Sequence, residues 1–136
     1  MTCTTFQMLG DAPSVREGLA RALRQPPLSE MSAEARSEAE LVLAEVLNNI
    51  AEHAYAAGCG PITLCLTAQP GRLCCRVEDQ GAPMPDHRLP PGNPPPPLDL
   101  SEGGYGWHLI RQLTTGLRYE RVGSVNQLSF VLMQRQ

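Results

Sequence analysis

Residues 43–55 read LAEVLNNIAEHAY, and this stretch carries two rows of side chains at helical spacing. Residues three and four apart lie side by side on a helix. One row is apolar and predicts a buried face: Leu43, Val46, Leu47, Ile50 and Ala54. The other row is polar: Glu45, Asn49, Glu52 and His53. The pattern predicts a long helix over 32–57 with one face in a core.

The polar row has two interpretations. Four polar residues on a helix are often only its solvated face. Asn is a poor residue for a helix interior because its side chain competes for backbone groups, yet Asn48 and Asn49 both lie there. An amide oxygen beside a carboxylate suits Mg²⁺, which takes hard oxygen ligands next to nucleotide phosphates. Glu45, one turn before Asn49, could then accept a proton during phosphoryl transfer.

The rest of the chain predicts an α+β fold. Apolar periodicity indicates further helices at 11–24 and 105–115, and strands at 4–9, 62–68, 72–79, 117–122 and 127–134. Short turns would join the second strand to the third and the fourth to the fifth, which implies a mostly antiparallel sheet. Helices on one face would make a two-layer α/β sandwich. The length predicts a single domain, 1–136.

Two glycine-bearing segments offer further binding groups. After a strand, the Asp79 carboxylate could accept a hydrogen bond from the amino group of adenine, and Gly81 would let backbone approach a flat base. The same D-x-G pattern is also a common turn. Gly103, Gly104 and Gly106 open a helix, whose unpaired N–H groups bind phosphate. G-G-x-G alone is weak evidence, since no parallel βαβ unit surrounds it.

Composition limits the classes of function. The net charge is −3, and all eleven basic residues are Arg. The lack of a basic patch argues against direct binding of nucleic acid or a membrane surface, and the lack of Lys excludes a Walker P-loop. Residues 1–10 carry no signal-peptide pattern, so a cytoplasmic location is predicted. The five cysteines, an odd number without C-x-x-C spacing, are predicted to be reduced thiols.

In this order the motifs resemble those of the GHKL ATPase superfamily, which has the Bergerat fold, over nearly the whole chain. The spacing E-x-x-x-N-x-x-x-H-A-Y at 45–55 is similar to the branch of anti-sigma-factor serine/threonine kinases. The resemblance implies that Glu45 is a general base, that Asn49 is the Mg²⁺ ligand and that His53 supports them near the phosphates of ATP. It assigns the other cofactor-binding positions to Asp79, Gly81, Gly103, Gly104, Gly106 and Ser129.

The resemblance also implies an activity and partners. A protein of this branch would phosphorylate a STAS-type anti-anti-sigma protein on Ser or Thr, sequester a sigma factor, and form a homodimer. The alternative is a nucleotide-binding partner-switch module without significant kinase activity, in which ATP only sets the interaction surface.

A proline-rich segment at about 83–102 is predicted to be the lid over the nucleotide. Eight of the thirteen prolines lie between Pro83 and Pro97. The lid departs from the family pattern because Pro83 replaces a glycine and because Arg88 is its one basic residue, which favours the alternative without catalysis. P-x-x-P spacing within Pro91–Pro97 leaves a third interpretation, an adaptor with a polyproline II ligand.

Overall fold

Five strands form one antiparallel sheet in the computed structural model, which describes residues 3–91 and 105–134. The sheet order is β1-β2-β3-β5-β4, and every neighbouring pair is antiparallel. The strands form where apolar and polar residues alternate, because alternate side chains point to opposite faces. Their bounds are β1 (Thr4–Leu9), β2 (Pro61–Gln69), β3 (Arg72–Asp79), β4 (Thr115–Val122) and β5 (Val125–Met133).

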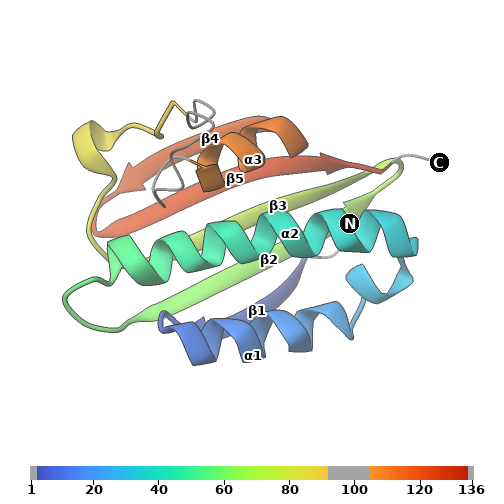
Figure 1. The fold of residues 1–136 in the computed structure, drawn as a ribbon, viewed down its shortest axis with the longest axis horizontal. Helices are drawn as coiled ribbons and strands as arrows, with labels where there is room; N and C mark the ends of the chain where they lie inside the picture. The colour runs from blue at the N-terminus through green and yellow to red at the C-terminus, as the bar shows by residue number, and fades with distance from the viewer. Residues whose placement is uncertain (1–2, 92–104, 135–136) are drawn as a thin grey trace.

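Three helices cover one face of this sheet (Figure 1). They are α1 (Ala12–Leu23), α2 (Ala33–Asn49) and α3 (Tyr105–Leu113), and α2 contacts both of the others. Asp11 and Ser32 cap α1 and α2, since their side chains accept hydrogen bonds from free N–H groups of the first turn. The predicted two-layer α+β sandwich is confirmed.

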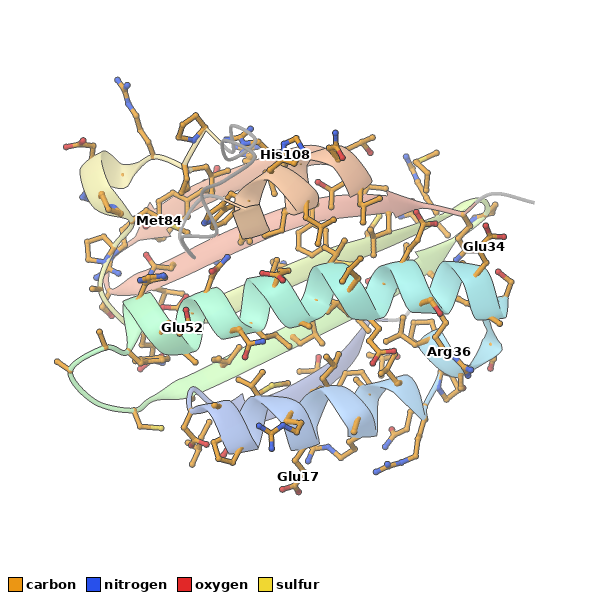
Figure 2. All side chains as sticks on the ribbon, viewed as in Figure 1. Glu17, Glu34, Arg36, Glu52, Met84 and His108 are labelled. Atoms are coloured by element: carbon orange, nitrogen blue, oxygen red, sulfur yellow. A yellow bond between two sulfur atoms is a disulfide. The ribbon has the colours of Figure 1, made fainter. Side chains whose placement is uncertain are left out.

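The core lies between the two layers. Leu43, Val46, Leu47 and Ile50 of the predicted apolar row are buried and Ala54 is half-buried. The row meets the inward side chains of the strands, of which Leu73, Cys75 and Val77 on β3 are examples. Charged side chains such as Glu17 and Glu34 point away from the sheet (Figure 2). The predicted buried face is therefore confirmed for four of its five residues. In the part of the chain that the structure describes, no helix is long and apolar enough to cross a membrane.

The second helix differs from the prediction at its C-terminal end. A continuous helix to residue 57 was expected, but α2 ends at Asn49 and a π-helical turn follows over Ile50–Ala54. The N–H of Tyr55 closes this turn by donating to the carbonyl of Ile50, five residues earlier, at 3.1 Å. Such turns are rare and are frequent at functional sites.

The cysteines also differ from the prediction. Cys3 and Cys65 form a disulfide between the N-terminal segment and β2, with their Cα atoms 6.0 Å apart, so the expectation of five thiols is corrected. The two residues are 62 positions apart in sequence, and only strand pairing brings them together. Cys59, Cys74 and Cys75 are free thiols. Burial raises the pKa of the Cys75 thiol far above its usual range, which leaves it unreactive.

Candidate functional site

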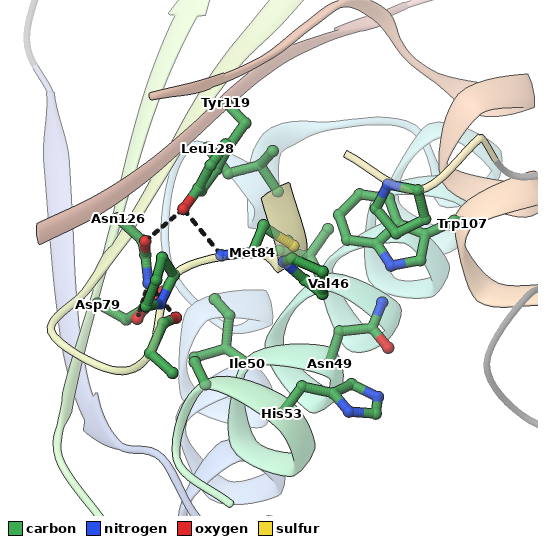
Figure 3. Close-up of a pocket in the computed structure, with 15 residues that line it drawn as sticks. Val46, Asn49, Ile50, His53, Asp79, Met84, Trp107, Tyr119, Asn126 and Leu128 are labelled. Atoms are coloured by element: carbon green, nitrogen blue, oxygen red, sulfur yellow. Dashed lines mark hydrogen bonds between the residues drawn. The ribbon is translucent and has the colours of Figure 1, made fainter. Parts of the chain in front are cut away.

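A cavity of about 420 Å³ lies between α2, α3 and the ends of β3 and β5 (Figure 3). This volume is in the range of small-molecule sites. Most of its wall is apolar and is formed by residues that include Val46, Ile50, Met84, Trp107 and Leu128. The polar groups of the wall stand at two separate ends, called here the carboxylate end and the amide end.

The carboxylate end is built around Asp79, the last residue of β3, whose side chain lines the cavity. Its Oδ1 atom accepts two hydrogen bonds of 2.8 Å, from the backbone N–H of Gly81 and from Nδ2 of Asn126. Asn126 lies directly opposite Asp79 in the pairing of β3 with β5. Among the described residues, none donates a hydrogen bond to Oδ2 of Asp79. One oxygen is therefore fixed by the protein, and the other is left for a ligand.

Burial raises the pKa of Asp79 above its ordinary value, because residue 79 is only 5% exposed and the charged form loses hydration. The hydrogen bonds from Asn126 and Gly81 and the positive charge of Arg121 oppose this rise, since each stabilises the carboxylate. The result is an acceptor that titrates above the usual aspartate range.

Gly81 has a packing role that the sequence did not predict. It does not line the cavity. A Cβ atom added to it would lie 2.4 Å from the carbonyl oxygen of Ala54, and the next N–H, that of Ala82, donates to the same oxygen at 2.9 Å. The glycine thus lets the turn after β3 dock on the end of the π-helical turn. The structure thus gives Gly81 a close approach to the end of the π-helical turn, and its predicted approach to a base stays a prediction.

The amide end is built around Asn49, the last residue of α2. Its Nδ2 atom is buried and has no hydrogen-bond partner among the described residues. An unpaired buried polar atom is costly, and a 180° rotation of the amide would place the oxygen there instead. An ion or phosphate group in the cavity would satisfy this amide.

Glu45 lies one turn before Asn49, against the start of α3. A Cβ atom added to Gly106 would lie 2.6 Å from Oε2 of Glu45 and 3.7 Å from Nδ2 of Asn49. A side chain at position 106 would require the flexible carboxylate of Glu45 to shift, whereas the distance to Asn49 is ordinary van der Waals contact. The structure therefore brings together three of the predicted residues, Glu45, Asn49 and Gly106.

Of the other predicted residues, one lines the cavity and two cannot be placed. His53 lines the cavity one turn after Asn49, with a side chain 68% exposed. Gly103 and Gly104 lie outside the described residues.

Ser129 is not brought to the site. It lines a separate hollow on the opposite face of the sheet, because side chains alternate along β5 and those of Asn126 and Leu128 point into the cavity. The residue beside Asp79 is thus Asn126, three positions earlier.

Sequence reasoning also missed three residues that hold the carboxylate end in place. The hydroxyl of Tyr119 and the guanidinium of Arg121, both on β4, donate to Oδ1 of Asn126 at 2.6 and 3.0 Å. The hydroxyl of Tyr55 donates to the carbonyl of Pro61 and accepts from the N–H of Gln80, both at 2.7 Å. Alternation along β4 could have placed Tyr119 and Arg121 on one face, but not beside Asp79.

The fold and the cavity together define a nucleotide-binding domain of the α+β class. The carboxylate can accept from a base amino group, the apolar wall can stack on the base, and the amide end offers oxygen ligands. A family model described as a histidine kinase-like ATPase domain matches residues 8–132. The match spans most of the chain, which therefore belongs to this family of ATP-binding, GHKL-type domains. No curated protein matches the chain significantly.

The residues present fit Mg-ATP. With its amide rotated by 180°, Asn49 would present an oxygen at the unpaired position, near the carboxylate of Glu45, and Mg²⁺ prefers oxygen ligands of this kind. Asn49 and Asp79 line the same cavity, as the prediction of one shared nucleotide site required.

Proposed function

We propose that this chain is a Mg-ATP-dependent protein serine/threonine kinase that also acts as an anti-sigma factor. It would phosphorylate a small STAS-type anti-anti-sigma protein and sequester a sigma factor in a partner switch. The observation that carries the catalytic part is the position of Glu45, one helical turn from Asn49 and against Gly106. The partners rest on the similarity of residues 45–55 to the anti-sigma branch.

On this proposal Glu45 accepts the proton of the substrate hydroxyl. The hydroxyl oxygen bonds to the γ-phosphorus while the bond from that phosphorus to the ADP oxygen breaks. Asn49 would hold the Mg²⁺, which neutralises charge on the phosphates. A domain that only binds ATP has no use for a carboxylate at this position, and for this reason we favour a kinase.

Phosphorylation would then switch partners by charge. A phosphoserine brings about −1.5 to −2 charges to the surface of the antagonist, which disrupts an interface that tolerated a hydroxyl. We place this reaction in the cytoplasm and expect a homodimer. Because cytoplasmic reductants keep most thiols reduced, the disulfide between Cys3 and Cys65 would form there only under oxidising conditions.

The second candidate is a partner-switch module that binds ATP without significant phosphoryl transfer. The scarcity of cations near the amide end favours it. Arg111 lies on α3 but donates to the carbonyl of Pro90 at 2.8 and 3.0 Å, and the chain has no Lys. The two candidates share the nucleotide site and differ only in the use of Glu45.

Incubation with labelled ATP and a candidate STAS antagonist separates the two. The variant Glu45→Gln keeps the size of the side chain but removes the base, so we expect transfer to fall by about 10²–10⁴-fold while Mg-ATP affinity is retained. Glu40→Gln is the matched control, since Glu40 is exposed on the same helix.

Transfer by Glu45→Gln at the wild-type rate would rule out the proposed base. Binding of Mg-ATP by the wild type without transfer to any antagonist would establish the second candidate. A wild type that binds no nucleotide at millimolar concentration would remove both.

A further inference from the structure

Residues 83–91, called here the strap, form one wall of the cavity. Pro83, Met84, Pro85 and Pro90 line it. The strap follows the turn after β3, contacts β4 through Met84 and reaches α3 at Pro90 (Figure 1). Whether this wall stays in place therefore depends on what holds these residues to β4 and α3.

Two hydrogen-bonded anchors hold the strap, one near each end. At the first, the backbone N–H of Met84 donates to the hydroxyl of Tyr119 at 3.0 Å. At the second, Nε and Nη2 of Arg111 donate to the carbonyl of Pro90 at 3.0 and 2.8 Å. Among the described residues, no other hydrogen bond joins the strap to a helix or strand. Leu89 adds an apolar contact with the core, but such a contact is not directional.

The backbone between the two anchors is strained. Asp86 and His87 have φ values of 56° and 54°, in the left-handed region that side chains other than glycine rarely adopt. Both residues are exposed, so no packing around their side chains compensates for the strain. A strained backbone persists only where the surrounding structure holds it, and such segments are frequent at ligand clamps and switches. The strap is therefore held in this conformation by its anchors.

The two anchors differ in strength. The hydroxyl of Tyr119 also donates to Oδ1 of Asn126 at 2.6 Å, which ties the first anchor to the buried network of the carboxylate end. Arg111 is exposed, and its acceptor is a neutral carbonyl that water can replace. The second anchor is thus the one that releases first, and it holds the end of the strap that lies against α3.

We propose that Arg111 is a latch, a positioning residue that holds the strap as a wall of the cavity and whose release lets a nucleotide enter and leave. The latch itself follows from the contacts of the strap. Its effect on a nucleotide rests on the ATP binding of the proposed function, but not on kinase activity or on the partners.

Tryptic cleavage of the ligand-free chain measures how often the strap opens. Trypsin cuts after arginine, and Arg88 lies exposed between the two anchors. Cleavage needs the segment to leave its place as an extended chain, so its rate follows the population of the open form. In Arg111→Met, which keeps a long side chain without donors, we expect the bond between Arg88 and Leu89 to be cut about tenfold faster. The urea midpoint should stay that of the wild type, because Arg111 is exposed.

Release of a nucleotide is the second measurement. Each variant is loaded with a fluorescent ATP analogue and Mg²⁺ and is then mixed with excess Mg-ATP. We expect Arg111→Met to release the analogue about tenfold faster than the wild type, by the same factor as the cleavage. Arg118→Met is the matched control, since it removes an exposed arginine that pairs with Glu120 on β4. It should keep the wild-type rates of cleavage and release.

Equal cleavage of Arg111→Met and the wild type at Arg88 would overturn the latch. The same acceleration in Arg118→Met would also overturn it, since the effect would not be specific to the contact with Pro90. Faster cleavage without faster release would overturn the role in nucleotide access while leaving ATP binding intact. A wild type that binds no nucleotide would overturn the proposed function and that role, and the cleavage rates would still decide whether Arg111 holds the strap.

Discussion

The two ends of the cavity differ in how their polar groups are satisfied. At the carboxylate end, Asp79 and Asn126 are tied to each other, to the backbone and to two side chains of β4 before any ligand arrives. At the amide end, Asn49 keeps a buried amide nitrogen without a partner among the described residues. On the proposed function, the fold preorganises the groups that would recognise the base, whereas the metal and phosphate groups would supply the missing partner of Asn49.

The largest expected effect is that of Asn49→Ala on metal-dependent binding. We expect the affinity for Mg-ATP to fall by about 100-fold, the upper end of what the supporting residues of a metal site contribute. Binding of ATP measured in the presence of a chelator should change much less. Because the amide has no partner to lose, the free energy of unfolding should stay within about 0.5 kcal/mol of the wild type. Equal losses with and without Mg²⁺ would contradict the assignment of Asn49.

Asn126→Ala should have the opposite profile. It removes one of the two donors to the carboxylate of Asp79 and the side-chain donor to the carbonyl of Ala82, so we expect the free energy of unfolding to fall by about 2–3 kcal/mol. Urea denaturation of both alanine variants measures the contrast directly. Similar free energies of unfolding for Asn49→Ala and Asn126→Ala would contradict the distinction between the carboxylate end, whose polar groups are paired, and the amide end, where one is unpaired.

A smaller effect is expected on the pH dependence of ATP binding. Burial raises the folded-state pKa of Asp79 above its ordinary value. The stability that protonation of Asp79 contributes is therefore complete below the unfolded value and is lost as pH rises through the folded value. ATP binding runs the other way, because it needs the carboxylate as an acceptor. Its affinity should fall by up to about tenfold per pH unit as pH drops below the folded pKa.

Titrations at several pH values above the ordinary aspartate range measure this step. Asp79→Asn should bind ATP weakly at every pH and lack the step. If the step persists in Asp79→Asn, another group is responsible for it.

The smallest expected effect is spectroscopic. Trp107 is the single tryptophan, is 4% exposed, and lines the cavity from α3. We expect saturating Mg-ATP to change its fluorescence emission, with Mg²⁺ alone as the control. An unchanged spectrum would contradict the placement of the nucleotide next to α3.

The elements of the fold were largely predictable because they depend on local periodicity. β1 and β3 begin and end at the residues that alternation predicts, 4–9 and 72–79. The π-helical turn over Ile50–Ala54 was missed. Within a single turn, the spacing of apolar residues cannot show whether each N–H bonds to the carbonyl four residues earlier, as in an α-helix, or five residues earlier, as in a π-helix. The disulfide was missed because it depends on the pairing of β1 with β2.

The amide end was predictable and the carboxylate end only in part, for the same physical reason. Glu45 and Asn49 lie on one helix, so their spacing in sequence gives their proximity in space. The partner of Asp79 lies on another strand, 47 residues away, and only register identifies it. The sequence predicted a strand only from residue 127, which left Asn126 in a turn, where Asn is common, so Asn126 offered no local signal in place of Ser129.

The hydrogen bond from Ala82 to Ala54 ties the turn after β3 to the end of the π-helical turn. The backbone from Asn49 to Ala54 therefore sets a fixed distance between the two ends of the cavity. One end of this segment is the amide of Asn49, which we propose faces the metal, and the other is the carbonyl of Ala54, which accepts from the N–H of Ala82 in the turn after Asp79. A ligand with a different spacing between its base and its first phosphate would contact one end of the cavity and not the other. The π-helical turn lies between these two ends. Deleting one residue within it would therefore change the distance between them without altering either contact surface.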